Sequence, residues 1–255
     1  MGVRGQMEMR SYYLLLIVFF SCSSSASEDI PSLEIDEIEK GVFLHKSYSE
    51  VHGWGLVSSN GLVVVNEGKA FIVDTPWSNQ DTENLVKWIR SRNYELLGSI
   101  STHSHEDRTA GIKWLNDNSI ATYATTLTNN ILRNEGKEQA VHSIKGNEIE
   151  LANDLLEVFY PGGGHTIDNV VVWLPKSKIL FGGCFVRSLE SKGLGYTGEA
   201  HIDKWSSSAE RAISNYPKAK TVVPGHGKIG DINLLEHTKY LADKASNTYE
   251  PNQSQ

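Results

Sequence analysis

The chain has 255 residues, of which 39% are hydrophobic and 22% are charged, and its formal net charge is −7. These values are typical of a soluble globular protein and leave open one large domain or two small ones. The negative charge and the lack of any dense run of lysine and arginine argue against a nucleic-acid-binding protein, because such proteins present a basic surface to the phosphates. We therefore expect no nucleic-acid partner.

The N-terminus has the pattern of an export signal. Arg4 and Arg10 flank its first part, the nine residues from Tyr12 to Phe20 are apolar, and small polar residues follow. Nine residues are too few for a helix that crosses a bilayer, which needs about 20, and the pattern is typical of a cleaved signal peptide. We expect a signal peptide over residues 1–26 and a single domain over 27–255. The mature protein is then periplasmic, monomeric and free of the membrane.

Two alternatives stay open at this end of the chain. The apolar run could be a buried core helix instead of a signal. Cys22 could be a lipid-attachment cysteine, although the two phenylalanines shortly before it make a poor lipidation signal. If the signal is removed, Cys184 is the single cysteine of the mature chain, so no internal disulfide forms and the thiol must be either buried or bound.

Apolar runs and turn residues predict the secondary structure in chain order. The first half holds two alternating segments over 33–46, a hairpin of strands over 62–65 and 70–73, a helix over 81–92 and a strand over 97–101. The second half holds strands over 155–160, 170–174 and 179–181, a helix over 205–215, a strand over 221–223 and a helix over 234–245. Strands mixed with helices in both halves predict an α/β fold, an αββα sandwich of two facing mixed β-sheets with helices on the outer faces.

The densest group of potential metal ligands follows the strand predicted over 97–101. His103 and His105 are two residues apart, and side chains at this spacing lie on the same side of an extended chain. Asp107 continues that side if the chain stays extended. A single histidine is more often structural, but two histidines and an aspartate in phase favour a metal site.

Three further candidates lie at strand ends or beside glycines. His165 follows three glycines, Cys184 ends a predicted strand, and His226 stands between two glycines after another strand. Each of them alone is more often an ordinary structural residue. Their shared placement favours functional roles, because functional side chains tend to occupy such loops. The remaining histidines are predicted not to bind metal: His45, His52, His142, His201 and His237.

The order of these residues resembles the zinc-ligand series of the metallo-β-lactamases. The resemblance rests on the segment from His103 to Asp107, on Gly-His165, on Gly-Gly-Cys184 and on Gly-His226-Gly, and it extends over about residues 33–245. An aspartate, a cysteine and a histidine at the second site are typical of the dizinc subclass B1. The resemblance implies a hydrolase that opens the β-lactam ring of penicillins, cephalosporins and carbapenems and gives antibiotic resistance.

The resemblance also implies two Zn²⁺ ions per chain. Three imidazoles would bind the first ion and leave it one open position for water, the pattern of a catalytic zinc site. Zinc lowers the pKa of a bound water to about 7, so hydroxide would be the nucleophile and Asp107 would be the catalytic residue that orients it. The second ion, with softer ligands, would hold the substrate carboxylate and stabilise the released nitrogen anion. The implied ligands are His103, His105 and His165 for the first ion, and Asp107, Cys184 and His226 for the second.

Four more residues are implied as neighbours of the metals or the substrate. Arg108 would lie behind the second site near Cys184, with a surface ion pair as the alternative. Arg187 would bind the substrate carboxylate, or else face the solvent. Trp54, with a glycine on each side, would form an exposed flap over the substrate. Tyr196, a third substrate-binding candidate, stands where many relatives have an asparagine, and its phenol either replaces that amide in stabilising the substrate's carbonyl oxygen or does not reach it.

Two other kinds of function remain open. A thioesterase, lactonase or nuclease of the wider superfamily would share the fold, but such enzymes usually carry a histidine directly after the motif aspartate and an aspartate between the metals. This chain has Arg108 and Cys184 at those places. A zinc-binding protein without catalysis is disfavoured, because the ligand set leaves a coordination position open.

Overall fold

The computed structural model describes residues 1–2, 30–146, 148–152 and 155–248. The predicted apolar signal run and Cys22 lie outside the described residues. Among the helices of the described part, none is long and apolar enough to cross a membrane.

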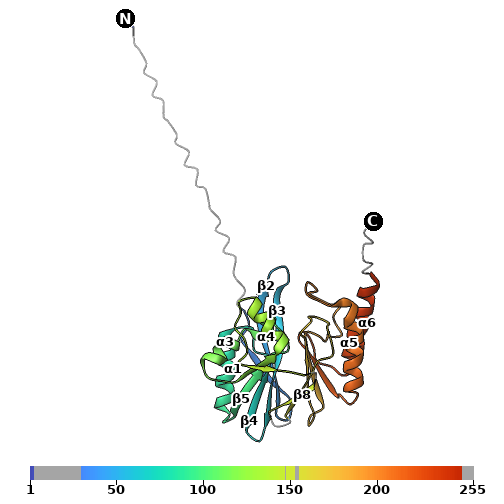
Figure 1. Cartoon of the computed structure of the whole chain (residues 1–255). Coiled ribbons are helices and arrows are strands. Elements are labelled where there is room, and N and C mark those ends of the chain that lie inside the picture. Colours follow the sequence, from blue (N-terminus) through green and yellow to red (C-terminus); the bar gives the residue numbers. More distant parts are fainter. Residues whose placement is uncertain (3–29, 147, 153–154, 249–255) are drawn as a thin grey trace.

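The described strands form two facing β-sheets (Figure 1). The first sheet contains, in spatial order, β1 (Glu34–Glu39), β2 (Val42–Val51), β3 (Gly55–Asn66), β4 (Lys69–Val73), β5 (Glu95–Ile100), β6 (Thr122–Thr125) and β7 (His142–Ile144). The second sheet contains β12 (Thr221–Pro224), β11 (Ile179–Gly183), β10 (Val171–Leu174), β9 (Leu156–Phe159) and β8 (Glu148–Leu151). Strands β4 to β7 run parallel, as do β11 and β12, and the other pairs are antiparallel.

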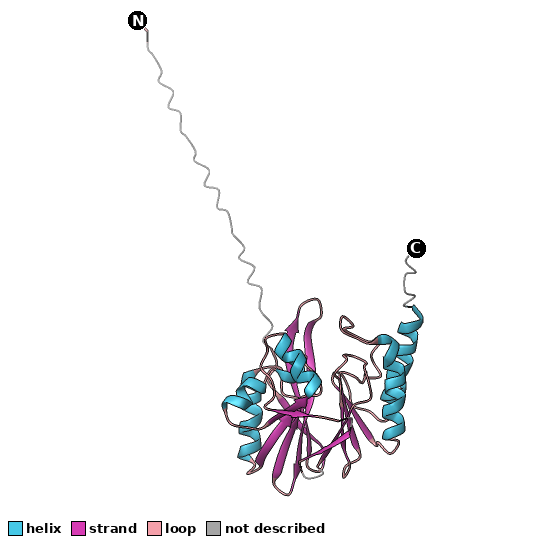
Figure 2. Cartoon of the chain, in the orientation of Figure 1, coloured by secondary structure: helices cyan, strands magenta, loops and turns pink. Residues whose placement is uncertain are grey.

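Helices cover the outer faces of both sheets (Figure 2). Those of the first half are α1 (Asn79–Ser91), α3 (Ile112–Asp117) and α4 (Thr126–Asn134), while the one-turn helix α2 (Glu106–Thr109) belongs to the loop after β5. Those of the second half are α5 (Ile202–Asn215) and α6 (Asn233–Thr248), which lie side by side outside the second sheet. The predicted αββα sandwich is confirmed.

Alternation along the strands divides the apolar residues between the layers. On β3, Leu62 and Val64 belong to the core between the two sheets, whereas Val63 belongs to the core under α1, and all three are buried. On β11, Phe181 faces the first sheet and Leu180 faces α5 and α6. Because both faces of these strands are covered, their sequences are continuous apolar runs and not alternating ones.

The segment between the two predicted halves holds elements that the sequence did not indicate. These are α2, α3, β6, α4, β7 and β8, each three to nine residues long. Such short elements carry too few repeats for a period to be recognised. The predicted helix over 81–92 begins two residues earlier, at Asn79, because Ser78 accepts a hydrogen bond from the backbone N–H of Asp81 and so caps the first turn.

One edge of the sandwich collects the loops of both sheets. It is formed by the C-terminal ends of β4, β5, β11 and β12, and we call it the site edge. Backbone hydrogen bonds join the sheets there, from the Asn60 N–H to the Gly225 carbonyl at 2.8 Å and from the Val170 N–H to the Thr102 carbonyl at 2.9 Å. The hairpin between β2 and β3 extends beyond this edge (Figure 1). The loops that carry the predicted ligands therefore meet at one place.

Candidate metal centre

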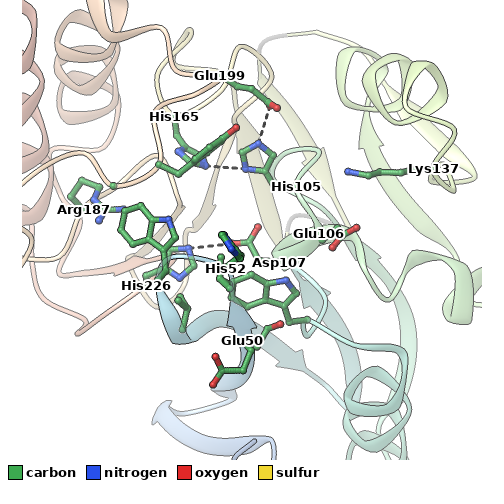
Figure 3. Close-up of a pocket in the computed structure, with 17 residues that line it drawn as sticks. Glu50, His52, His105, Glu106, Asp107, Lys137, His165, Arg187, Glu199 and His226 are labelled. Atoms are coloured by element: carbon green, nitrogen blue, oxygen red, sulfur yellow. Dashed lines mark hydrogen bonds and ion pairs between the residues drawn. The ribbon is translucent and has the colours of Figure 1, made fainter.

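Three histidine rings converge at the site edge. His103 and His105 come from the loop after β5, and His165 comes from the loop between β9 and β10. Their ring centroids form a triangle with sides of 4.7, 5.0 and 5.0 Å, and the His165 Nε2 lies 3.1 Å from the His105 Nδ1 (Figure 3). The structure thus brings together the three residues predicted to bind the first ion.

Asp107 reaches the site in a different way from the one predicted. The chain bends after β5, and α2 begins at Glu106, so Asp107 lies in the first turn of a helix and not on an extended segment. The expected convergence with His103 and His105 is present, but strand alternation is the wrong explanation. A helical turn changes the direction of the side chain, and this lets Asp107 face the neighbouring group of ligands.

A second triangle of ligand atoms adjoins the first. The Asp107 Oδ2, the Cys184 Sγ and the His226 Nε2 are each 3.2 Å from the other two. Cys184 directly follows β11 and His226 follows β12, so the parallel pairing of these strands places them side by side. The Nδ1 of His226 donates to the Ser58 carbonyl at 2.6 Å, which leaves its Nε2 as the ring nitrogen available to a metal.

The residues fit zinc. Ligand atoms around a tetrahedral zinc lie about 3.3–3.8 Å apart, given metal–ligand distances of about 2.0–2.3 Å, and the second triangle is close to this. Within the described part of the chain, both ring nitrogens of His103 are buried and have no hydrogen-bond partner. A buried polar atom without a partner is costly, and a metal ion would satisfy one of these nitrogens. Nitrogen, thiolate and carboxylate donors are the ligands that zinc uses in proteins.

The protonation states suit metal binding. Burial and, to a smaller extent, the neighbouring His105 lower the pKa of His165 to about 3. Burial likewise lowers the pKa of His103 well below its ordinary value, so both rings are neutral at physiological pH. Burial raises the pKa of Asp107, but Arg108 and His226 outweigh it and hold that pKa well below its usual range.

The pKa of His226 is likewise set by burial and by neighbouring charges. Burial lowers the pKa of this imidazole, but the adjacent Cys184 and Asp107 raise it to about 10. These two groups therefore favour a positive charge at the second triangle.

Arg108 lies directly behind the second triangle, and its side chain is 0% exposed. Its Nη2 is 3.0 Å from the Cys184 Sγ and 2.9 Å from the Asp107 Oδ2, and its Nη1 is 3.2 Å from the Asp74 Oδ2. The alternative of a surface ion pair therefore does not hold. Asp74 belongs to the same group of charges, and the sequence analysis gave it no role.

Two members of each triangle line a cavity of about 550 Å³, His105 and His165 from the first and Asp107 and His226 from the second (Figure 3). Arg187 and Lys137 lie on opposite sides of it (Figure 3). The Arg187 guanidinium lies against Gly195, and its Nε has no hydrogen-bond partner among the described residues. Trp54 lines the cavity from the β2–β3 hairpin and is 59% exposed. Both placements agree with contacts to a substrate.

Tyr196 also lines the cavity, but its hydroxyl is turned back onto its own loop. A Cβ at Gly198 would lie only 2.4 Å from that oxygen, so the phenol occupies the space above this glycine. The ring stands edge-on to His105, with 5.8 Å between the ring centroids. Tyr196 therefore forms an aromatic wall of the cavity in this conformation.

Glu199 is a functional candidate that sequence reasoning missed. Its Oε2 lies 2.9 Å from the Nε2 of His105, whose Nδ1 faces His165 (Figure 3). A carboxylate at this place fixes the tautomer of the ring and orients it toward a metal. Glu199 is 94 residues from His105 in sequence, so only the fold reveals the pair. The acidic residue in Gly-Glu199-Ala was the one available signal.

Comparisons with known proteins agree with this site. A family model described as the metallo-beta-lactamase superfamily matches residues 54–226. A metallo-beta-lactamase type 2 from Pseudomonas aeruginosa is 47% identical over 230 residues, which cover 90% of this chain and 92% of that protein. A protein of the same name from Bacteroides fragilis is 31% identical over 241 residues, covering 92% and 97%.

Solved structures give the same result. TMB-1 superposes with a TM-score of 0.85 at 73% identity, covering 86% of this chain and all of that chain. DIM-1 exposed to ceftazidime gives 0.85 at 69% identity, with the same coverage. FIM-1 from Pseudomonas aeruginosa, in a mono-zinc form, gives 0.81 at 32% identity, covering 85% and 97%.

The fold and the two adjoining ligand triangles define a metallo-hydrolase. The chain belongs to the metallo-β-lactamase superfamily and, within it, to the subclass B1 group. The family predicted from the ligand series is confirmed, and so is zinc as its metal. The roles of single residues, and the number of ions per chain, stay predictions.

The Glu199–His105 pair makes a testable prediction. Glu199→Ala should weaken zinc binding at the three-histidine site by about tenfold, the lower end for a ligand's hydrogen-bond partner, because this carboxylate is half-exposed. Glu199→Gln, which keeps an acceptor without the charge, should lose less. Zinc affinity is measured by competition with a chelator. Glu210→Gln, a surface carboxylate paired with Lys239, serves as the control. Equal affinities for Glu199→Ala and the parent would contradict the role.

Proposed function

We propose that this chain is a zinc-dependent β-lactamase that hydrolyses the amide bond of the β-lactam ring in penicillins, cephalosporins and carbapenems. The observation that carries the proposal is the pair of adjoining ligand triangles beside one cavity, which Arg187 also lines. Family membership supports the reaction class. The product is a ring-opened amino acid without antibiotic action.

We assign two zinc ions per chain, one to each triangle of ligands. When bound, zinc acts as a Lewis acid toward a carbonyl oxygen and makes water nucleophilic near neutral pH. His103, His105 and His165 would hold one ion, and the neutral state of the two most buried rings suits this. Asp107, Cys184 and His226 would hold the other, and the Arg108 cation behind them balances their negative charge.

Other residues of the cavity bind the substrate, orient the attacking water and exclude bulk water. The guanidinium of Arg187 binds the substrate carboxylate and so fixes the position of the ring amide. The Asp107 carboxylate, itself part of the second triangle, accepts a hydrogen bond from the attacking water and orients it. Water adds to the carbonyl carbon, the bond from carbon to nitrogen breaks, and the nitrogen takes up a proton. Trp54 covers the substrate and excludes bulk water.

Metal removal tests this function. Exhaustive chelation should abolish the hydrolysis of a colour-changing cephalosporin, and added zinc should restore it, because no other group in the cavity is proposed to activate water. Circular dichroism before and after chelation controls for unfolding. The function is wrong if the protein hydrolyses the substrate at its full rate while elemental analysis finds no zinc.

Arg187 separates substrate binding from chemistry. Its contact with the carboxylate exists in both the ground state and the transition state, so its loss should raise KM more than it lowers kcat. A charged hydrogen bond contributes about 1.5–3 kcal/mol, so Arg187→Ala should lower kcat/KM by about ten- to a hundredfold. Arg187→Lys should recover part of this, and zinc content should not change.

Lys137→Ala is the matched control, since it removes a cation from the opposite side of the same cavity. It should leave KM within about twofold of the parent value. A kcat/KM of Arg187→Ala within twofold of the parent, on substrates that carry the carboxylate, would show that Arg187 does not bind this group.

We also propose that residues 1–26 are an export signal and that residues 27–255 form one periplasmic domain that acts as a monomer. The charged start, the apolar run and the small residues after it support cleavage near Ser27. The intact mass of the protein from a bacterial host should match a chain without its first 26 residues. A mass that includes Cys22 with a diacylglycerol group would mean a lipoprotein, and an uncleaved chain would exclude export.

A further inference from the structure

A buried histidine lies close to the metal centre without belonging to it. His45 stands on β2, only 1% exposed, and its Nε2 is 3.0 Å from the backbone carbonyl oxygen of Asp74. Its register partner on the neighbouring strand β3 is Gly61, where a Cβ would lie 2.3 Å from two atoms of the His45 ring. The glycine therefore leaves the space that the imidazole occupies. Together, these two residues direct a polar ring to the end of β4.

The hydrogen bond has a defined direction. A carbonyl oxygen only accepts, so the His45 Nε2 carries the proton and donates it. Burial lowers the pKa of His45 to about 3, and the carbonyls of Asp74 and Val73 oppose this. The ring is therefore neutral at physiological pH, with one N–H, and that N–H is directed at Asp74.

Every polar atom of Asp74 takes part in a hydrogen bond. Its φ of 59° lies in the left-handed region, which is unfavourable for a residue other than glycine, so its surroundings must fix it. Its N–H donates to the Ile100 carbonyl at 2.8 Å, and its C=O accepts from His45. Its carboxylate accepts from the Thr102 N–H at 2.7 Å, from the Thr102 hydroxyl at 2.8 Å and from Arg108 at 3.2 Å.

Arg108 connects the backbone conformation of Asp74 to the second ligand triangle. The Arg108 guanidinium contacts Asp74 with one nitrogen, and Cys184 and Asp107 with another. A planar guanidinium cannot change one contact without rotating the others. If the Asp74 backbone relaxed, its carboxylate and the Arg108 fork would move together, and the distances among the ligand atoms of the second triangle would change.

We propose that His45 is a positioning residue for the second zinc site, because it holds the left-handed backbone of Asp74 and, through Asp74 and Arg108, sets the places of Asp107 and Cys184. The inference rests on the proposed two-zinc function. It assigns no contact between His45 and a metal or a substrate. Its effect should be larger at the second triangle, which Arg108 contacts directly, than at the three-histidine site, which Asp74 reaches only through the backbone of Thr102.

The test compares two amide substitutions of His45 that differ in side-chain length. The amide nitrogen of His45→Gln can take the place of the His45 Nε2 and donate to Asp74, whereas that of His45→Asn is too short to do so. Cobalt(II) replaces zinc in the exported mature protein. A thiolate-to-cobalt absorption band then reports the site that contains Cys184, and the ligand-field bands report the three-histidine site. Affinities come from chelator competition, without any measurement of activity.

We expect His45→Asn to weaken cobalt binding at the thiolate site by about tenfold, the lower end of the effect of removing a ligand's hydrogen-bond partner. The loss at the three-histidine site should be clearly smaller, and His45→Gln should stay close to the parent at both sites. Thr122→Val is the control for a general loss of stability. It removes a buried hydroxyl that bonds to Asn116 and to the backbone of Val141, away from the metal centre, and should change neither affinity.

Three results would overturn the proposal. Parent-like affinity of His45→Asn at the thiolate site would show that the contact positions nothing. An equal loss at both sites would show a general structural role. A parent protein without any thiolate-to-cobalt band would remove the second metal site, and with it both this inference and the two-zinc function, whereas a parent band with an unchanged His45→Asn would remove this inference alone.

Discussion

The metal centre depends on one buried cation. The Arg108 side chain is fully buried between the two sheets, where an uncompensated charge would be very unfavourable. It is compensated from both sides, by Asp74 at the end of β4, by Asp107 in α2, and by Cys184 beyond β11. Removing a single partner from such a group typically costs about 3–5 kcal/mol. The position of this arginine therefore constrains both the packing of the sheets at the site edge and the arrangement of the ligands.

The two ligand triangles differ in charge, and this difference comes from their surroundings. Burial among other imidazoles keeps His103 and His165 neutral, so the first triangle offers uncharged nitrogen donors. The second triangle combines an ionised Asp107 with a thiol beside a cation. The Arg108 cation and His226, whose pKa is about 10, offset the charge of Asp107 there. The two triangles therefore offer a metal ion different donors: neutral nitrogens at the first, and charged groups balanced by a cation at the second.

The sequence indicated which residues converge better than how they converge. The spacing of His103, His105 and Asp107, with glycines beside the later candidates, was sufficient to select them because metal chemistry restricts residue type and order. The path of the chain was not evident, since α2 is only four residues long and its first turn changes the direction of Asp107. Glu199 and His45 make their contacts over 94 and 29 residues of sequence. No local period records such contacts, so only the fold reveals them.

The short segment from His103 to Asp107 has a further consequence. It supplies two ligands to one triangle and one ligand to the other within five residues, and Arg108 follows directly. With an ion at each triangle, as proposed, the ion that orders this segment at one position would also order the backbone at the other. The binding free energies of the two ions would then be linked, and because linkage is reciprocal, each ion would change the affinity for the other by the same factor. Partial metal loss would accordingly involve the whole loop and would not be the independent emptying of two sites.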